Sequence, residues 1–479
     1  MTSKGKAGIL WLARDLRLSD NPALRAAIDD GPLLAVFVID GQVERQGAAS
    51  RWRLQRGLCS LDAELRRRTR GSGLLVLRGE AEQVLPDLVR LTGAKSVHQS
   101  DWPAPGMRDA QDRVRNALTP LGARLILHPG FLLTHPGNVR TAQGGVYRVY
   151  TPFARALRAV GVDRPAAAAP EAIVAFSKPP SGLALAELQL APDMHGGAEV
   201  LERFALPAGE AAAFARLDEF LDHATSYDAD RDRPDLDATS GLSEHLALGE
   251  ISPRTVWAMA RDRMEREASK ADGIGKFLSE LIWREFAWHL FIDFPQMDRS
   301  PWRSEWSAFP WRRSNTSLER WTRAETGIAL VDAGMREMRV TGRMHNRVRM
   351  VVASYLTKHL LTDWRLGMSH FAESLTDWDP ASNAMNWQWV AGCGPDASPF
   401  FRIFNPEKQA TQYDPQGSYR RRWLAGWMGK PTDEAMAYFD SLPSSWQVSR
   451  DWRERGGLDE ARKQALAAFE EFKEGAPRR

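Results

Sequence analysis

Short apolar runs alternate with amphipathic stretches along the first part of the chain, up to residue 132. The apolar runs, which predict β-strands, occupy 7–13, 32–39, 73–78, 95–100 and 123–128. The amphipathic stretches, which predict helices, lie near 21–30, 52–70, 81–92 and 107–120. Because buried parallel strands are continuously apolar and need helical crossovers, the pattern predicts a doubly wound, Rossmann-like parallel sheet. No GxGxxG follows a strand, so dinucleotide binding is not indicated here.

The pattern changes after this α/β region. The segment 160–205 is rich in Ala, Pro, Gly and Ser (RPAAAAPEA, SKPPSG), which predicts a connecting segment too long for an ordinary loop. From Pro207 onward, apolar residues recur at i, i+3 and i+4, as in helices. We therefore expect an α/β + all-α protein, with an α/β domain at 1–132, a connector at 133–206 and an all-helical domain at 207–479.

Composition narrows the class of protein. With 43% hydrophobic and 26% charged residues, the chain has the balance of an ordinary globular protein. A net charge of +3 permits a local basic face without demanding nucleic acid. Its two cysteines, Cys59 and Cys393, form no CxxC pair, so neither a disulfide framework nor a metal site is expected. The sequence shows neither a signal peptide nor a membrane span, and we expect a cytosolic protein.

Tryptophan is concentrated in the second half of the chain. Of 18 tryptophans, only Trp11, Trp52 and Trp102 precede Trp257. The stretch 344–406 combines aromatic residues with arginines, asparagines and acids. That combination suits stacking on flat ligands such as a flavin ring or nucleobases.

One candidate site lies in FLSELIWREFAWHLF. Glu280, Trp283 and Arg284 are spaced i, i+3 and i+4, so they share one helix face. A carboxylate, an aromatic plane and a guanidinium on one face could grip a flat polar base. The alternative is an amphipathic helix with a surface Glu–Arg pair and a core tryptophan.

A second candidate is the helical stretch MHNRVRMVVASYL. Asn346, Arg349 and Met350 share one stripe, whereas Arg347 points elsewhere and could meet a phosphate. Arg349 could pair with a buried acid, for which Asp377 is a candidate, because buried charge needs a partner. The alternative is a solvated basic face.

Hydroxyl side chains gather before another apolar helical run. Thr239, Ser240 and Ser243 together with backbone N–H groups could seat a phosphate at a helix N-terminus. Simple N-capping is the alternative.

Acids and an amide precede two tryptophans further along the chain. Asp377, Asp379 and Asn383 come before Trp387 and Trp389. A carboxamide could hydrogen-bond a ring nitrogen that changes protonation during redox chemistry. An Asx-turn between helices is the alternative.

Taken together, these segments resemble the photolyase/cryptochrome family over nearly the whole chain. The matching motifs, in order, are LWLARDLRLSDNPAL, YRVYTPF, TSGLS, ELIWREF, TGRMHNRVRM, DWDPASNAMNWQW and FFRIFNP. The likeness is greatest to bacterial cyclobutane pyrimidine dimer photolyases of class I and the related class III. It implies light-driven repair of these dimers in DNA by electron transfer from photoexcited reduced FAD.

The resemblance also implies where FAD is held in the helical domain. The residues expected at its phosphates and ribityl chain are Tyr227, Arg231, Thr239, Ser240, Leu242 and Ser243. Arg349, Asp377 and Asp379 would surround the isoalloxazine, and Asn383 would face N5. Trp387, Trp364 and Trp311 match the family's electron-transfer chain between flavin and surface.

By the same resemblance, UV-damaged DNA is the partner. The residues expected to touch the flipped dimer are Glu280, Asn346 and Met350, with Trp283 and Trp389 as aromatic walls and Arg284 beside them. Arg347 and Arg402 would meet backbone phosphates.

The resemblance implies an antenna chromophore in the α/β domain. We expect 5,10-methenyltetrahydrofolate, because the C-terminal half is most similar to class III proteins. The alternative is 8-hydroxy-5-deazaflavin, because Arg51 and Asp101 lie near where the pocket for that chromophore would be. A monomer in the bacterial cytosol or nucleoid, without an obligate protein partner, is expected.

Two rival functions stay open. A cryptochrome would signal without repair, which the combination of Glu280, Trp283, Met350 and Trp389 disfavours. A (6-4) photolyase uses a histidine pair, whereas His345 has Asn346 beside it. The chain departs from the family pattern at Arg343, where relatives often have a tryptophan, and at Glu244, Met385 and Asn386.

Overall fold

A five-stranded parallel sheet forms one end of the molecule. The computed structural model describes residues 6–194, 196–396 and 399–475. The strands are β1 Gly8–Leu12, β2 Leu33–Ile39, β3 Leu75–Arg78, β4 Ser96–Ser100 and β5 Arg124–His128, in the order β3-β2-β1-β4-β5. All neighbouring pairs are parallel. The five predicted strands and the α/β class are thereby confirmed.

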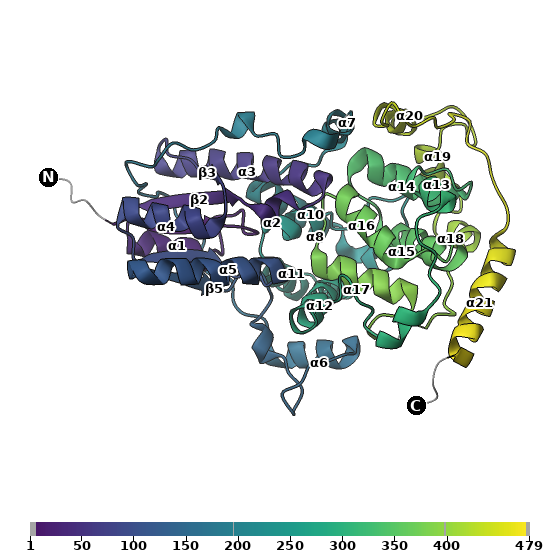
Figure 1. The fold of residues 1–479 in the computed structure, drawn as a ribbon, viewed down its shortest axis with the longest axis horizontal. Helices are drawn as coiled ribbons and strands as arrows, with labels where there is room; N and C mark the ends of the chain where they lie inside the picture. Colours follow the sequence, from purple (N-terminus) through teal and green to yellow (C-terminus); the bar gives the residue numbers. More distant parts are fainter. Residues whose placement is uncertain (1–5, 195, 397–398, 476–479) are drawn as a thin grey trace.

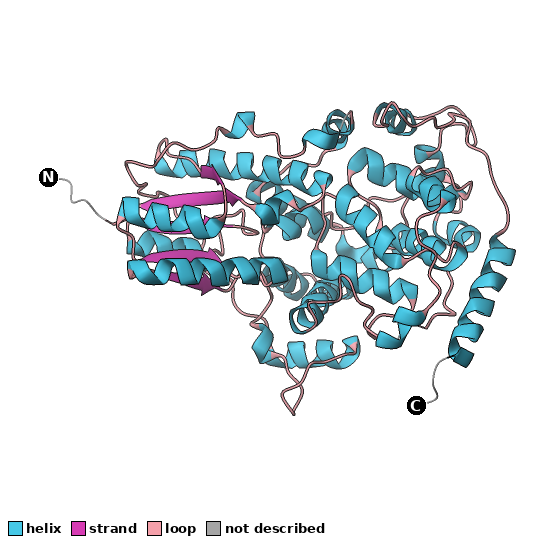
Figure 2. Ribbon diagram, viewed as in Figure 1, coloured by secondary structure: helices cyan, strands magenta, loops and turns pink. Residues whose placement is uncertain are grey.

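Helices cover both faces of this sheet (Figure 2). They are α1 Pro22–Asp30, α2 Gly41–Glu44, α3 Ala48–Thr69, α4 Ala81–Thr92 and α5 Pro105–Leu118. Side chains of β1 alternate between the faces: Leu10 and Leu12 pack with α1 and α3, whereas Ile9 and Trp11 pack with α4 and α5. Because both faces are buried there, the central strands β1 and β2 are continuously apolar.

The connector runs back over the α/β end before it reaches the helical part. It contains α6 Tyr150–Val160 and α7 Gly197–Phe204, with short turns η3 Leu185–Glu187 and η4 Pro192–Met194 between them. Leu33 N donates to Val174 O at 2.8 Å, and Leu183 N donates to Val76 O at 2.8 Å. The long connecting segment expected from composition is therefore fastened along the strands β2 and β3.

The rest of the chain is helical, as its periodicity predicts (Figure 1). The helices are α8 Glu210–Asp222, α9 Tyr227–Asp230, α10 Ser243–Leu248, α11 Pro253–Arg266, α12 Ala271–Asp293, α13 Thr316–Thr322, α14 Ala329–Thr341, α15 Asn346–Ser354, α16 Trp364–Ser374, α17 Pro380–Ala391, α18 Pro406–Tyr413, α19 Ser418–Trp423, α20 Asp433–Asp440 and α21 Leu458–Gly475. None of the described helices is both long and apolar enough to cross a membrane.

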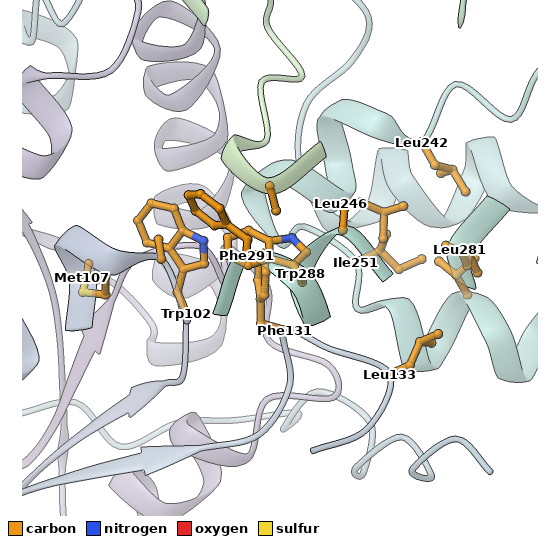
Figure 3. Packing of buried hydrophobic residues seen from close by; sticks show 14 of the residues in the cluster. Trp102, Met107, Phe131, Leu133, Leu242, Leu246, Ile251, Leu281, Trp288 and Phe291 are labelled. Atoms are coloured by element: carbon orange, nitrogen blue, oxygen red, sulfur yellow. The ribbon is translucent and has the colours of Figure 1, made fainter. Parts of the chain in front are cut away.

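The hydrophobic core is continuous between the two parts. Figure 3 shows Trp102, from the loop after β4, close to Trp288 and Phe291 of α12. Phe131 meets Trp288 edge to face, with ring centroids 5.0 Å apart. The sheet is thus packed directly onto the helices that carry the candidate site.

A buried ion cluster joins the two parts as well. Arg53 of α3 donates from Nη1 and Nη2 to Glu250 at 2.9 and 2.7 Å, and from Nε to Glu244 at 2.9 Å. Arg53 and Glu250 are completely buried. Glu244 also accepts from the Thr376 hydroxyl at 2.6 Å. The departure from the family pattern at Glu244 therefore has a structural partner in the α/β part.

Candidate functional site

The predicted pair of Arg349 and Asp377 is present in the structure. Arg349, on α15, donates from Nη2 to Asp377 Oδ2 at 2.8 Å and from Nε to the Met344 carbonyl at 2.7 Å. The Asp377 side chain is only 4% exposed. The guanidinium thus compensates an enclosed carboxylate, and the reading of α15 as a solvated basic face is wrong at this position.

Asp379 begins α17, the helix that also carries Asn383. Its Oδ1 accepts from Ser382 N at 2.7 Å, and Pro380 is the first helical residue, an arrangement that favours a helix start. Its Oδ2 accepts from Trp288 Nε1 at 2.9 Å. Asn383 lies one turn further along and donates to the Met368 carbonyl at 3.0 Å. Asp379 therefore orients α17 and with it Asn383.

The hydroxyl-rich segment before α10 is held by an arginine from α8. Arg216 donates to the carbonyl oxygens of Thr239 and Ser240 at 2.8 and 2.9 Å. The backbone of this segment is therefore fixed, and neither side chain is used as a cap for α10. Ser243, the first residue of α10, is exposed, whereas Leu242 is buried.

Two consecutive residues after α9 tie α12 to α15. Arg231 forms an ion pair with Glu280 of α12, and Asp232 forms one with Arg347 of α15. The Arg231 guanidinium also lies 5.6 Å from the ring centroid of the buried Tyr227. The structure thus brings together predicted FAD-binding and predicted lesion-binding residues.

Trp283 and Arg284 do not point the same way, so the expectation of one shared face with Glu280 is corrected. Arg284 turns toward the connector, where Nη1 donates to the Phe131 carbonyl at 3.2 Å and the guanidinium lies 4.5 Å from the Phe131 ring centroid. Burial lowers the pKa of Arg284. The i, i+3, i+4 spacing gave the approximate side of the helix, but the covering segment was not visible in the sequence.

The start of α15 presents two of the predicted lesion contacts. Asn346 is exposed, and its amide lies 3.9 Å from Met350 Sδ one turn later. His345 caps the helix through Nδ1, which accepts from Arg347 N at 3.2 Å. Burial lowers the pKa of His345 to about 4, so the ring is neutral near pH 7.

Trp389 lies at the end of α17, next to the segment that carries Arg402. The Arg402 guanidinium is 5.5 Å from the Trp389 ring centroid, and Phe401 beside it is 66% exposed. This places a cation and aromatic rings together, as single-stranded nucleic acid requires. Ala397 and Ser398, which precede the FFRIFNP motif, lie outside the described residues.

Two of the three predicted wire tryptophans are buried, and the third reaches the surface. Trp387 and Trp364 are 2% and 1% exposed, whereas Trp311 is partly exposed. A Cβ added at Gly367, one turn after Trp364 on α16, would lie 2.2 Å from the Trp387 ring. Arg312, which follows Trp311, exchanges backbone hydrogen bonds with Leu361 and Asp363 at 2.7 and 2.8 Å. The helix α16, which Trp364 begins, is therefore in contact with Trp387 on one side and adjoins the Trp311 segment at its start.

A π-helical turn, η8 Tyr355–His359, separates α15 from this tryptophan region. Leu360 N donates to the Tyr355 carbonyl five residues earlier, at 3.0 Å. Lys358 within the turn is completely buried, where Nζ donates to the Ala391 carbonyl at 2.8 Å and lies 3.5 Å from the Phe400 ring centroid. Such turns are frequent at functional sites.

Several buried polar atoms around Arg349 have no hydrogen-bond partner among the described residues. They are Asp377 Oδ1, Trp378 Nε1 and Arg347 Nε. Native proteins rarely leave such atoms unsatisfied, so a polar group that is not part of the chain is the natural partner. Donors and acceptors beside enclosed aromatic residues fit the ring and chain of FAD.

Comparison with known proteins agrees with this geometry. The family described as DNA photolyase matches residues 8–171, and the one described as FAD binding domain of DNA photolyase matches residues 277–471. A deoxyribodipyrimidine photo-lyase of Agrobacterium fabrum is 42% identical over 428 residues, 88% of each chain. The chain belongs to the DNA photolyase family.

Solved photolyase structures share the fold over nearly the whole chain. A bacterial class III photolyase from Agrobacterium tumefaciens matches with a TM-score of 0.88 and 38% identity over 99% of both chains. A Synechocystis cryptochrome matches with a TM-score of 0.84 and 28% identity, over 96% of this chain and 99% of its own.

The α/β part has a small cavity of its own, about 20 Å³, at the carboxyl ends of β1 and β2. Its lining is formed mainly by apolar side chains with a few polar ones, namely Trp11, Arg14, Phe37, Val38, Asp40, Gln42, Gln46, Trp102 and Met107. Burial lowers the pKa of Arg14 to about 10, so the residue stays cationic near pH 7. Asp101 is paired with Arg108 at 2.8 Å, and Arg51 donates to the Leu190 carbonyl at 2.8 Å.

The remaining departures from the photolyase pattern are also accommodated. Arg343 donates to the Phe204 carbonyl at 3.4 Å, Met385 is buried, and Asn386 donates to the Ser382 carbonyl at 2.8 Å. Sequence reasoning missed Trp288 as the partner of Asp379, because a core tryptophan gives no signal of its polar contact.

Proposed function

We propose that this protein is a deoxyribodipyrimidine photo-lyase that repairs cyclobutane pyrimidine dimers in DNA under blue or near-UV light. The observation that carries the proposal is the pair of adjacent residues Arg231 and Asp232. Through their ion pairs they link Glu280 of α12 to Arg347 of α15. This link supports a site in which a carboxylate, an amide and stacking surfaces would lie beside the groups suited to a flavin.

The lesion is received by residues of three helices. Glu280, Asn346 and Met350 would touch the flipped dimer, and Trp283 and Trp389 would form its aromatic walls. Flipping costs a few kcal/mol and least at a damaged, poorly stacked site. Stacking on an aromatic side chain returns about 1–3 kcal/mol per base, enough to offset that cost. Glu280 would stabilise the negative charge on the dimer by hydrogen bonding.

FAD would be held between the α9–α10 segment and α17. Tyr227, Arg231 and the segment containing Thr239, Ser240, Leu242 and Ser243 would bind its phosphates and ribityl chain. Arg349 and Asp377 would orient the ring, and Asn383 would face N5, with Asp379 setting the position of α17. Reduced FAD, when bound, supplies on illumination the electron that opens the cyclobutane ring and later returns.

The tryptophans Trp387, Trp364 and Trp311 would carry electrons inward from the surface to reduce the cofactor before repair. The burial of Trp387 and Trp364, the partial exposure of Trp311 and the contact at Gly367 support this route.

UV-damaged DNA would bind across this face with its backbone on Arg347 and Arg402. In the free protein Arg347 is paired with Asp232, so a phosphate would compete with that carboxylate. Because phosphate contacts release counterions, affinity should fall with salt. We propose a monomer acting in the bacterial cytosol, where the DNA is.

We propose that residues 1–132 form the antenna domain, 133–206 the connector and 207–479 the catalytic domain. The antenna would be 5,10-methenyltetrahydrofolate, which the likeness to a class III photolyase supports. Releasing the chromophore by denaturation and measuring its mass and absorption tests this; 8-hydroxy-5-deazaflavin would overturn it.

The decisive test is a repair assay. The protein with reduced flavin is mixed with an oligonucleotide carrying one thymine dimer, illuminated, and assayed for restored thymines against a dark control. Light-dependent restoration is expected. Without it, FAD that is bound and photoreducible would indicate a cryptochrome, and repair of a (6-4) lesion would indicate that activity instead.

A further inference from the structure

The indole of Trp283 is covered on one face by a residue of the connector. The rings of Tyr150 and Trp283 stack with centroids 3.6 Å apart and planes 3° from parallel. Phe286, on the same helix as Trp283, meets both rings edge to face at 6.0 and 5.9 Å. A planar ligand can therefore stack on Trp283 only from the side opposite Tyr150.

Tyr150 is itself held firmly against α12. Its hydroxyl donates to the Ser279 carbonyl at 3.0 Å. In an α-helix this carbonyl also accepts the N–H of the residue four positions later, which is Trp283. Burial raises the pKa of Tyr150 to about 12, so the hydroxyl keeps its proton and remains a donor.

The helix that Tyr150 begins is anchored next to it. Phe153, one turn into α6, is 1% exposed and packs on Phe286 and His289 with centroids 5.2 and 4.7 Å apart. Tyr150 thus rests on a fixed element, although it lies within the connector, where its only signal in the sequence is the family motif YRVYTPF.

We propose that Tyr150 is a positioning residue for lesion recognition, which fixes the Trp283 indole in the orientation that a flipped pyrimidine requires. This inference rests on the proposed function. A free indole on the protein surface would have to be ordered when DNA binds, and that ordering weakens binding. The stack on Tyr150 orders the indole beforehand, so the contact with the lesion retains more of its stacking energy.

The consequence is specific to damaged DNA. Undamaged strands bind through phosphate contacts and do not insert a base beside Trp283. Loss of the Tyr150 ring should therefore reduce affinity for a dimer and leave affinity for undamaged DNA unchanged.

The test is a double-mutant cycle with Tyr150→Ala and Trp283→Ala. Dissociation constants for dimer-containing and undamaged oligonucleotides are measured in the dark, and repair yield per photon is measured at saturating DNA. Tyr150→Ala removes the stack on Trp283 and leaves the Trp283 indole unordered. This variant should therefore bind the dimer about tenfold more weakly. Binding to undamaged DNA and the repair yield at saturation should stay unchanged.

Three further variants make the result specific. Tyr150→Phe keeps the ring and loses only the hydroxyl, so it should restore most of the selectivity. Tyr150→Leu, which fills space without a ring, should behave as Tyr150→Ala does and replaces it if the smaller side chain impairs folding. Tyr147→Ala removes a ring that packs on Phe153 and His289 and should leave selectivity intact.

In the Trp283→Ala background, Tyr150→Ala should cause no further loss, since Tyr150 acts through Trp283. An equal loss in both backgrounds, or wild-type selectivity in Tyr150→Ala, would overturn the role of Tyr150. A wild-type protein that bound dimer-containing and undamaged DNA equally would instead overturn the proposed function.

Discussion

Replacing Arg53 by methionine should destabilise the protein more than any surface charge substitution. Arg53 bonds to both oxygens of Glu250 and to one of Glu244 while completely buried. Methionine fills a similar volume, so the main effect is the loss of charge compensation for two enclosed carboxylates. Breaking a buried ion pair from one side costs about 3–5 kcal/mol, and we expect a loss of that size in the free energy of unfolding.

The loss should depend on pH. Burial alone would raise the pKa of Glu250, but hydrogen bonds from His245 and Arg53 outweigh burial and lower it. A lowered pKa in the folded state stabilises the wild type at every pH above the pKa of the unfolded chain, which is about 4.3. This contribution disappears as the pH falls through the pKa of the folded state. In Arg53→Met, burial prevails and destabilises the ionised carboxylate. The difference between variant and wild type should therefore be greatest at alkaline pH and shrink on acidification.

Urea unfolding followed by circular dichroism measures this difference. The matched control is Arg56→Met, one turn further along α3, whose pair with Glu202 is partly exposed; an exposed pair contributes about 1 kcal/mol or less. Because Glu244 directly follows the segment proposed for FAD, the Arg53 variant should also retain less FAD. An Arg53→Met protein as stable as the control, or one whose deficit grows on acidification, would refute the reasoning.

Three other substitutions test separate parts of the molecule. Glu280→Gln should lower repair yield per photon while FAD stays bound, and an unchanged yield in the repair assay would remove Glu280 from the chemistry. Trp311→Phe should slow photoreduction of oxidised FAD, followed by absorption, but spare repair by pre-reduced enzyme; normal photoreduction would require another route. Burial raises the pKa of Glu285 to about 7, so folded protein holds a proton that unfolded protein releases. The contribution of Glu285 to wild-type stability should then fall as pH rises from about 4 to 7. Glu285→Gln lacks this contribution, so its urea-unfolding stability relative to the wild type should rise over that range; a slope equal to that of the wild type would contradict the assignment.

Strands β1 and β2 were predictable because each is enclosed on both faces and therefore apolar throughout. Even the polar strand β4 was found from its place in the alternation, and its His98 is satisfied by His128 and Asp30. The strand order was not predictable from periodicity, because the alternation gives the number of crossovers and not their direction. The four-residue α2 is too short to show a period.

The candidate site was predictable where a buried charge demanded a partner, as for Arg349 and Asp377. It was not predictable where a distant segment decides which face of a helix is covered. Phe131 turns Arg284 inward, and Tyr150 covers Trp283 from a stretch whose only signal was its family motif. Arg53 stands among several arginines in 51–68, and nothing local marks it as the one that is buried.

The π-helical turn at Tyr355–His359 makes the length of this part of the chain as important as its composition. One extra residue in a helical turn rotates everything that follows by about 100° relative to an unbroken α-helix. Arg349 before the turn and Leu361 after it are therefore oriented correctly at the same time only at the present spacing. Deleting a single residue here would turn Leu361–Asp363 away from Arg312 and detach the Trp311 segment, whereas the exposed stretch of the connector around 141–145 should tolerate insertions. The protein should accordingly tolerate insertions and deletions in the connector but not in this turn.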